Sequence, residues 1–348
     1  MNIVVSLDYE IYFGRRSGSV ERSLIEPTNA LCDIALRNGI VLVFFVDIGY
    51  LLRLKQQARQ HPALVAAHDS VMRQLDTLVS AGHELQLHIH PHWEDSVWTD
   101  DGWRLDMRRY RLHDFSDLEI AEIISRYTQA LRAIGGDRSV FAFRAGGWCI
   151  QPFDRLREPL RHAGILIDST VYANGRQFGD GQRYDFTQAP RESHWRFEHD
   201  PLRIDPNGSF LEVPIASHPV MPNFYWKLGI AKKLNKGKHR PMADGSPLPL
   251  SRADFLRKLF LPTASVVSID GFKASLLAAA FQAYQRRQMS DFVIIGHPKA
   301  FSRFSLQTFE NFVVSRKMHN FVGFGAYEQC QRHEILSTRP TDSAAGLY

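Results

Sequence analysis

The sequence predicts an α/β protein, in which parallel strands are covered by helices packed outside them. Strand-like and helix-like stretches alternate over most of the chain. Residues 40–46 (IVLVFFV) form a continuous apolar run, which is typical of a strand covered on both faces. Asn38-Gly39 and Ala81-Gly82 supply stop signals after amphipathic segments. This order favours an α/β barrel or an open doubly wound sheet.

The alternation can be followed along the chain. Strands are expected at residues 3–7, 40–46, 84–90, 140–144 and 165–167, and helices at 23–37, 62–80, 117–134 and 153–162. A second regular region contains a helix at 272–287, a strand at 292–296 and a helix at 306–316. We therefore expect a single domain over residues 1–333, followed by a mobile polar tail at 334–348.

The middle of the chain interrupts this rhythm. Residues 172–268 are irregular and rich in Pro, Gly and Asn, apart from a short strand at 210–214. Long insertions in α/β folds usually lie at one rim of the sheet and carry specificity. We expect this segment to be an insertion at the rim of the active site.

Composition excludes several classes of protein. With 44% apolar and 23% charged residues, the chain is globular rather than disordered. Three scattered cysteines exclude a disulfide scaffold, and a net charge of +5 without a binding motif gives no reason to expect nucleic acid as a partner. The N-terminus does not read as a secretory signal, and no apolar run is long enough to span a bilayer. We expect a cytoplasmic protein, whose oligomeric state the sequence leaves open.

One segment is strongly basic. Residues 225–240 (YWKLGIAKKLNKGKHR) contain six Lys or Arg and no acid, interleaved with aromatic and aliphatic residues. One interpretation makes residues 224–240 a peripheral contact with anionic lipid or with a phosphate-linked substrate. The other is a solvated helix face whose apolar side is in the core.

The first candidate site residues are two carboxylates at the end of the first strand. Asp8 and Glu10 are separated by one residue, and alternate side chains of an extended chain share a face. This arrangement suits one acid as a metal ligand and the other as a base. The alternative is a strand end with two solvated acids.

Three histidines follow the third expected strand. His88, His90 and His92 would share one face of an extended chain, whereas only His88 and His92 would share a face if the chain turns helical. In both cases at least two imidazoles converge. Two histidines and one carboxylate leave coordination positions open, which is typical of a catalytic zinc site.

Two further strands end in residues that are candidates for the site. Arg144 ends a buried strand and needs a carboxylate partner, for which Asp8 is the natural candidate. Gly146 and Gly147 would allow close backbone approach and could present amides to an oxyanion, or form a simple strand-to-helix turn. His297 ends the strand at 292–296 and is either a general acid or a packed core histidine.

Together and in this order, these features resemble the NodB-homology polysaccharide deacetylases (carbohydrate esterase family 4). The motifs that carry the resemblance are Asp8-Tyr9-Glu10, Gly82-His83-Glu84 with His88 and His92 four residues apart, Phe143-Arg144, Asp168-Ser169-Thr170, and His297 after Ile294-Ile295. They cover residues 1–170 and about 290–300. The chain departs from the family at Tyr9, which separates the two acids, at Gly146, where a proline is usual, and at Val171, where a second Asp is expected.

The resemblance implies a fold and a set of roles. The fold would be a distorted (β/α)7-type barrel with a long irregular insertion. One zinc or similar divalent ion per chain would be held by Glu10, His88 and His92. The remaining implied roles are Asp8 as base, His297 as acid, Arg144 orienting Asp8, Asp168 orienting His297, and a backbone amide near Gly147 holding the oxyanion. We expect Trp93, Gly147, Trp148 and His90 to contact substrate, although His90 has no counterpart in the family motifs.

The implied reaction is metal-assisted hydrolysis of an acetamido group on a sugar or glycan. The N-terminus does not read as a secretory signal, which is compatible with a cytoplasmic branch of the family that serves lipopolysaccharide or O-antigen biosynthesis. Two alternatives stay open. One is another metal-dependent hydrolase, such as an amidohydrolase or a phosphoesterase barrel, and the other is a catalytically silent glycan-binding relative.

Overall fold

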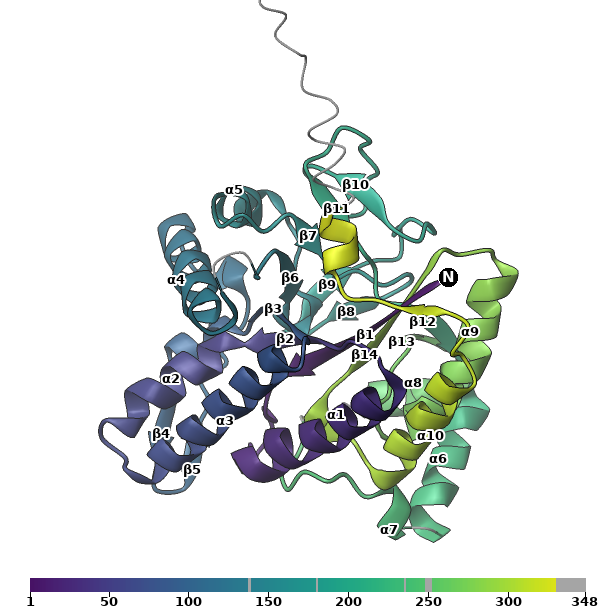
Figure 1. Cartoon of the computed structure of the whole chain (residues 1–348), viewed down its shortest axis with the longest axis horizontal. Coiled ribbons are helices and arrows are strands. Elements are labelled where there is room, and N and C mark those ends of the chain that lie inside the picture. Colours follow the sequence, from purple (N-terminus) through teal and green to yellow (C-terminus); the bar gives the residue numbers. More distant parts are fainter. Residues whose placement is uncertain (137–138, 180, 235, 248–251, 330–348) are drawn as a thin grey trace, which may run out of the picture.

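A computed structural model gives the structure of residues 1–136, 139–179, 181–234, 236–247 and 252–329 (Figure 1). The expected tail at 334–348 lies outside the described residues. Within the described residues, one continuous path of seven parallel strands forms a sheet that curls into a half-barrel. In spatial order they are β14 (Asp291–Gly296), β1 (Asn2–Tyr9), β2 (Val43–Asp47), β3 (Glu84–Ile89), β6 (Ala142–Ala145), β7 (Ile167–Asp168) and β11 (Phe210–Glu212).

The chain after β11 returns toward the opposite edge of this sheet. The backbone N–H of Ile215 donates to Val171, and that of Ala216 donates to Val293 on β14. Ala216 also accepts from Val267, which runs beside β14 on its other edge. These bonds bridge the two ends of the curled sheet, so the expected distorted (β/α)7-type barrel is present.

Helices cover the outside of the strands (Figure 1). They are α1 (Glu26–Asn38), α2 (Ile48–Ala58), α3 (Ala63–Ser80), α4 (Asp117–Gly135), α5 (Asp154–His162), α9 (Leu277–Arg286) and α10 (Arg303–Val314). Local signals fix their ends: the Ser116 hydroxyl accepts the Glu119 N–H at the start of α4, and Gly39 ends α1 in the left-handed region. The sequence analysis missed α2, which follows β2 without a break.

The two faces of the strands have separate cores. Ile3, Val5 and Leu7 of β1 pack outward in the large core shared with the helices. Val4 faces a smaller inner core together with Phe45 of β2 and other residues of the neighbouring strands. Because side chains alternate along a strand, the even-numbered residues of β1 point into the barrel. The last of them are therefore delivered to its carboxyl end.

The segment 172–268 is more ordered than the sequence predicted. Besides β11, it adds β10 (Trp195–Phe197), antiparallel to β11 in the main sheet, and the hairpin of β8 (Arg176–Phe178) with β9 (Arg183–Asp185). It also adds the antiparallel pair of β12 (Ser217–Val220) and β13 (Thr263–Val266). It also forms α6 (Pro222–Leu234), α7 (Lys236–His239) and α8 (Arg252–Phe260). The segment therefore contains strands and helices that its sequence pattern did not predict.

Two short peripheral pairings complete the fold. β4 (Val97–Thr99) and β5 (Gly102–Arg104) form an antiparallel hairpin after β3, and β15 (Asn320–Phe321) pairs with the start of β1. Among the described residues, no helix is long and apolar enough to cross a membrane.

Candidate active site

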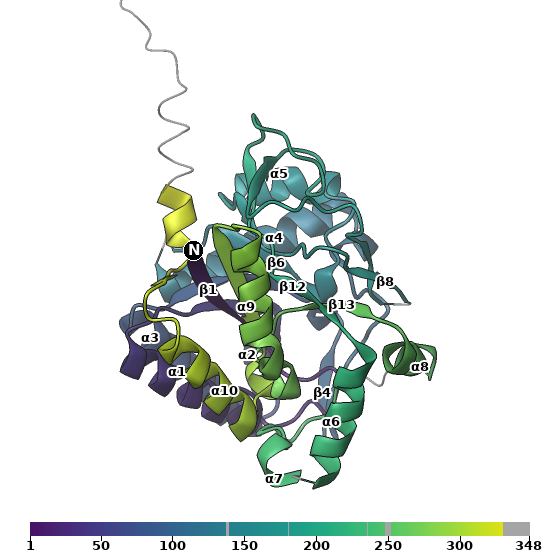
Figure 2. The ribbon, with the colours of Figure 1, turned by 90° about the vertical axis from the view of Figure 1, so that its right-hand side faces the viewer.

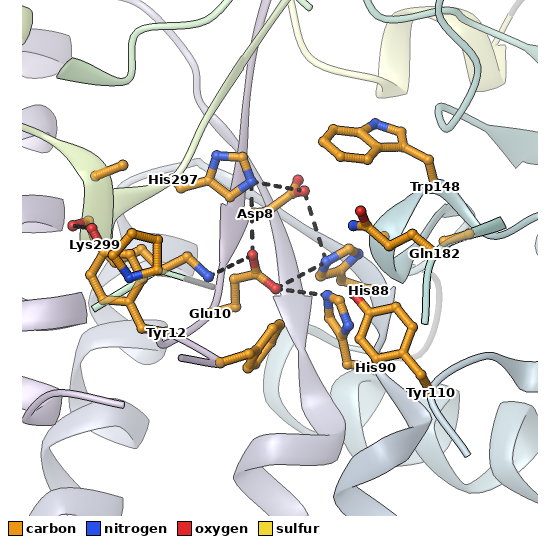
Figure 3. A pocket seen from close by; sticks show the side chains of 15 residues that line it. Asp8, Glu10, Tyr12, His88, His90, Tyr110, Trp148, Gln182, His297 and Lys299 are labelled. Carbon is orange, nitrogen blue, oxygen red and sulfur yellow. Dashed lines mark hydrogen bonds and ion pairs between the residues drawn. The ribbon is translucent and has the colours of Figure 1, made fainter. Parts of the chain in front are cut away.

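A pocket at the carboxyl ends of the barrel strands gathers most of the predicted site residues (Figure 3). Asp8 and Glu10 come from the end of β1, His88 and His90 from β3, and His297 from the residue after β14. Parallel strands end at the same edge of a sheet, which explains why motifs separated by 289 residues meet here.

Glu10, His88 and His90 form the cluster that could hold a metal ion. One ligand atom from each lies within 4.8 Å of the others, and all three residues are buried. His90 Nε2 is 2.7 Å and His88 Nε2 is 3.5 Å from Glu10 Oε2. Glu10 Oε2 and His88 Nε2 are buried without a hydrogen-bond partner. Buried polar atoms left unpaired are costly, so their convergence fits a cation that would satisfy them.

The histidine geometry also fits a metal ligand. His88 Nδ1 donates to the carbonyl oxygen of Arg144 at 2.8 Å, so its Nε2 is directed at the cluster. A backbone acceptor on the far nitrogen is the usual partner of a metal-bound imidazole. Burial lowers the pKa of His90 to about 4, although Glu10 opposes this shift, so its ring is neutral near pH 7. Burial acts in the same direction on His88, but Asp8 and Glu10 raise its pKa to about 9.

The predicted metal ligand His92 does not join this cluster. β3 runs to Ile89, and His90 is still extended, so His88 and His90 share the inner face. Pro91 then begins a 3-10 turn that directs His92 away, where its ring stacks on Tyr110 and packs against Phe13. Both nitrogens of His92 are buried and lack a hydrogen-bond partner. Of the extended and the helical conformation considered for this segment, the chain is therefore extended through His90.

Glu10 is held by a residue that the sequence analysis missed. Lys299 donates from Nζ to Glu10 Oε1 at 2.8 Å and to the Ile11 carbonyl at 2.7 Å. Burial by itself would raise the pKa of Glu10, but Lys299 and His90 outweigh it and hold that pKa well below its usual range. Lys299 stands two residues after His297, and that alternate spacing was the signal available in the sequence.

Asp8 and Arg144 form a buried ion pair. Arg144 Nη1 lies 2.6 Å from Asp8 Oδ1, and the Arg144 side chain is almost completely inaccessible. Its other nitrogens donate to the Ser6 hydroxyl and to Ser169, and the guanidinium lies 4.1 Å over the ring of Phe45. Every edge of the guanidinium therefore has a partner, which is the condition for burying a charge. The contact that the sequence analysis expected is present.

His297 is paired with Asp270 rather than with Asp168. Asp270 Oδ2 lies 2.8 Å from His297 Nδ1, and Oδ1 accepts the backbone N–H of His297 at the same distance. Burial disfavours the imidazolium, but Asp270 outweighs it and raises the pKa of His297. His297 Nε2 points to Asp8 Oδ2 at 3.6 Å. The role given to Asp168 was wrong.

Asp168 instead belongs to a buried acidic pair. It is adjacent to Glu212 in the β7–β11 register, and Thr170 donates to it through both its N–H and its hydroxyl. Burial raises the pKa of both carboxyls, and the charge of Asp168 raises the pKa of Glu212 further. One proton shared between two carboxyls is the ordinary result of such an arrangement.

The predicted substrate contacts divide into two groups. Gly147, Trp148 and His90 line the pocket, and Trp148 lies on the same side of it as Gln182 (Figure 3). Trp93 does not: it is 1% exposed, and its Nε1 donates to Asp47 at 2.6 Å inside the core. The prediction that Trp93 contacts substrate was therefore wrong. Tyr12, Tyr110 and Gln182 complete the lining and carried no motif in the sequence.

The glycines after β6 are required by close approach. A Cβ on Gly146 would lie 2.4 Å from the Ile89 carbonyl oxygen and 2.6 Å from His90 Nδ1. Gly147 has φ +61°, and Trp148 follows it with φ +60°. A non-glycine residue in this region is unusual and clusters at functional sites. The turn thus presses β6 against His90 and turns Trp148 toward the pocket.

Comparisons with known proteins find distant likeness only. No family model and no curated protein matches the chain. Among solved structures, a protein assigned as a polysaccharide deacetylase from Mycobacterium smegmatis is 14% identical, with a TM-score of 0.48 over 96% of this chain and 91% of that one. The allantoinase PuuE is also 14% identical, with a TM-score of 0.47 over 97% and 91%. A family 4 carbohydrate esterase from Streptomyces lividans is 17% identical, with a TM-score of 0.26 over 49% and 60%.

Proposed function

We propose that this chain is a metal-dependent hydrolase that removes an N-acyl group from an amino sugar. The observation that carries the proposal is the meeting of three units in one pocket. These are the Glu10–His88–His90 cluster, the Asp8–Arg144 ion pair and the His297–Asp270 pair. The motif resemblance points to the same chemistry and to an acetamido group on a glycan.

Glu10, His88 and His90 would hold the metal, with zinc the first candidate for a site of two imidazoles and one carboxylate. When bound, such an ion polarises an amide carbonyl and makes water a better nucleophile. Within the described residues, these three form the one group with metal-site geometry. One such cluster favours the deacetylase over a two-metal amidohydrolase or phosphoesterase.

The remaining groups are placed for proton transfer. Asp8, oriented by Arg144, accepts the proton of the attacking water. His297, whose pKa Asp270 raises, donates a proton from Nε2 to the departing amine. The backbone at Gly147 faces the pocket and is the candidate donor to the oxyanion. The presence of an acid, a base and a ligand cluster argues against a catalytically silent glycan-binding relative.

Following the motif resemblance, we further propose that the glycan belongs to a bacterial surface polysaccharide, such as lipopolysaccharide O-antigen. The test combines metal analysis with a screen for acetate and formate release from N-acylated amino sugars, nucleotide sugars and O-antigen fragments. We expect one divalent ion per chain and acyl release from at least one class. Protein that holds no metal, and gains none on titration, would overturn the proposal.

A further inference from the structure

A second cavity opens directly beside the reaction pocket. It shares Trp148 and Gln182 with that pocket, and both lie on the side of the site opposite Lys299 (Figure 3). Its walls come from the β8–β9 hairpin, from α8 and from the segment that contains β13 and Lys273. A substrate that reaches the metal cluster past Trp148 would extend into this cavity.

The second cavity is lined by positive charge. Of the fifteen described residues that line it, four are basic and none is acidic; the four, here called the basic pocket, are Arg176, Arg257, Lys258 and Lys273. Two of the four have a carboxylate partner outside the lining: Asp185 is 3.5 Å from Arg176, and Asp270 acts on Lys273. Clustered cations of this kind repel one another and attract an anion.

The electrostatics of Lys273 show this excess of positive charge. Burial lowers the pKa of Lys273, Asp270 partly restores it, and Lys258 lowers it further. The carboxylate of Asp270 is already engaged by His297 through both oxygens. An anion in the cavity would offset the repulsion between Lys258 and Lys273, which Asp270 offsets only in part.

Neutral hydrogen-bonding groups complete the lining. Asn174, Gln177 and Ser265 line the same cavity, and the Tyr225 hydroxyl lies 3.0 Å from Thr263 Oγ1. Cations together with neutral donors are the groups that bind phosphate oxygens.

We propose that the basic pocket binds a phosphate or diphosphate group carried by the amino-sugar substrate. The proposal rests on the proposed function and narrows it, because it assigns the substrate to phosphate-linked sugars rather than neutral polymers. A sugar phosphate, a nucleoside diphosphate sugar and a lipid diphosphate sugar all offer this chemistry. In each of them the N-acyl group would be at the metal cluster and the phosphate beyond Trp148.

The first test is calorimetric titration of the metal-loaded protein with inorganic pyrophosphate. We expect binding that weakens with salt and falls about tenfold or more in Lys273→Gln and in Arg257→Gln. Arg257 is exposed, so its replacement spares the fold. The matched control is Lys317→Gln, an exposed lysine outside the pocket lining, and it should bind like the wild type.

Pyrophosphate could also be held by the metal itself, and the same titration of His88→Ala protein separates the two sites. Affinity that survives His88→Ala and is lost in Lys273→Gln supports the subsite. Affinity that disappears in His88→Ala and survives in Lys273→Gln overturns it, as does the absence of binding. Metal content is read on the same samples, so a failed subsite is distinguishable from a failed proposed function.

The second test compares N-acyl release from a free amino sugar, its 1-phosphate, a nucleoside diphosphate sugar and a lipid diphosphate sugar. We expect Arg257→Gln to raise KM far more for the phosphorylated substrates than for the free sugar. The member of the series with the highest kcat/KM identifies the source of the phosphate. Equal effects on all four substrates would overturn the subsite.

An independent observation concerns the surface of α6 and α8, which lie together at one edge of the molecule (Figure 2). Trp226, Ile230 and Leu234 are spaced by four residues on α6, and Leu256 and Phe260 are spaced likewise on α8. All five side chains are more than half exposed, and we call them the apolar face. The segment at 224–240 therefore buries Phe224 but exposes three other apolar side chains, so the interpretation that places its apolar side in the core holds only in part.

The charge around the apolar face identifies its partner. α6 and α7 contain no acidic residue, and Lys227, Lys233 and Arg240 are exposed there. Exposed aromatic and aliphatic side chains beside exposed lysines match the boundary of an anionic bilayer. We infer that the apolar face docks peripherally on a membrane that contains anionic phospholipid.

Sedimentation with lipid vesicles tests this inference. We expect binding to equal mixtures of phosphatidylcholine and phosphatidylglycerol, weaker binding at high salt, and none to phosphatidylcholine alone. Ile230→Ser combined with Leu234→Ser should abolish binding, whereas Leu118→Ser, an equally exposed leucine on α4, should not. Absence of vesicle binding, or an Ile230/Leu234-dependent dimer in sedimentation velocity, would overturn the inference.

Discussion

Asp270 holds His297 at two points, because its Oδ2 lies 2.8 Å from the ring Nδ1 and its Oδ1 accepts the backbone N–H of the same residue at 2.8 Å. One carboxylate therefore fixes both the backbone position and the ring orientation. Nε2 is left to face the pocket, 3.6 Å from Asp8 Oδ2. A general acid needs this combination of a fixed ring and a raised pKa.

Asp270→Asn should shift the pH dependence of turnover. His297 must carry a proton to act as an acid, so activity falls as the pH rises through its pKa. Loss of the Asp270 charge lowers that pKa, and the alkaline limb of the kcat profile should move to lower pH. We also expect kcat to fall roughly 10- to 100-fold, as is usual when the orienting partner of a functional histidine is lost.

Asp168→Asn is the matched control for this experiment. It makes the same substitution at the carboxylate that the sequence led us to expect as the partner of His297. Its alkaline limb should coincide with that of the wild type. If Asp168→Asn moves the limb and Asp270→Asn does not, the assignment of the orienting carboxylate is reversed.

The position of His297 could be predicted from the sequence, but its pairing with Asp270 could not. Apolar strands ending in Asp8, His88, Arg144 and His297 are local patterns, and parallel strands bring their ends together without further information. Asp270 follows a long segment without a clear motif, and it reaches His297 only because residues 267–269 run beside β14. That pairing is non-local and leaves no periodic signal in the chain.

The histidines give the same lesson at shorter range. The sequence allowed an extended chain or a helical turn after His88, and these alternatives select different ligands. The extended chain continues through His90, and the 3-10 turn begins at Pro91. A shift of one residue in that boundary would exchange His90 for His92, and boundaries are the least certain part of a sequence prediction.

His90→Gln and His92→Gln should have opposite effects on metal content. His90→Gln removes a proposed ligand, so bound metal should fall from about one ion per chain to a small fraction of that. His92→Gln lies behind the cluster and should retain the ion, with its cost confined to packing against Tyr110 and Phe13. Elemental analysis of both proteins, with circular dichroism to confirm folding, is the measurement.

The opposite pattern, metal lost in His92→Gln and kept in His90→Gln, would restore the ligand set that the motif spacing implies. Loss in both folded variants would require His92 to move into the site when the ion binds. Retention in both would exclude the cluster as the metal site.

Asp8→Asn should separate metal binding from chemistry. The amide keeps the shape of the carboxylate but cannot accept the proton of water, so acyl release should fall by roughly 10²- to 10⁴-fold. Glu10, His88 and His90 are unchanged, so the metal should remain bound. Turnover and metal content are measured on the same preparation, and turnover equal to the wild type would refute the role of Asp8.

The Asp168–Glu212 pair should make stability depend on pH. Burial, and then Asp168, raises the pKa of Glu212 well above its ordinary value of 4.5. As the pH rises from that value toward the raised pKa, the folded protein keeps a proton that the unfolded chain has released. The free energy of unfolding must therefore decrease across this window and level off above it.

Glu212→Gln should remove most of this decrease. The amide is neutral at every pH and can donate to Asp168, while its oxygen still accepts the Val171 N–H that Glu212 Oε1 accepts at 3.1 Å. Thermal unfolding from about pH 5 to about pH 8 should then show a smaller loss of Tm in Glu212→Gln than in the wild type. Glu122→Gln, the same substitution at an exposed position on α4, should follow the wild type. If Glu212→Gln loses as much Tm as the wild type over this range, the two carboxyls do not share a proton in the folded protein.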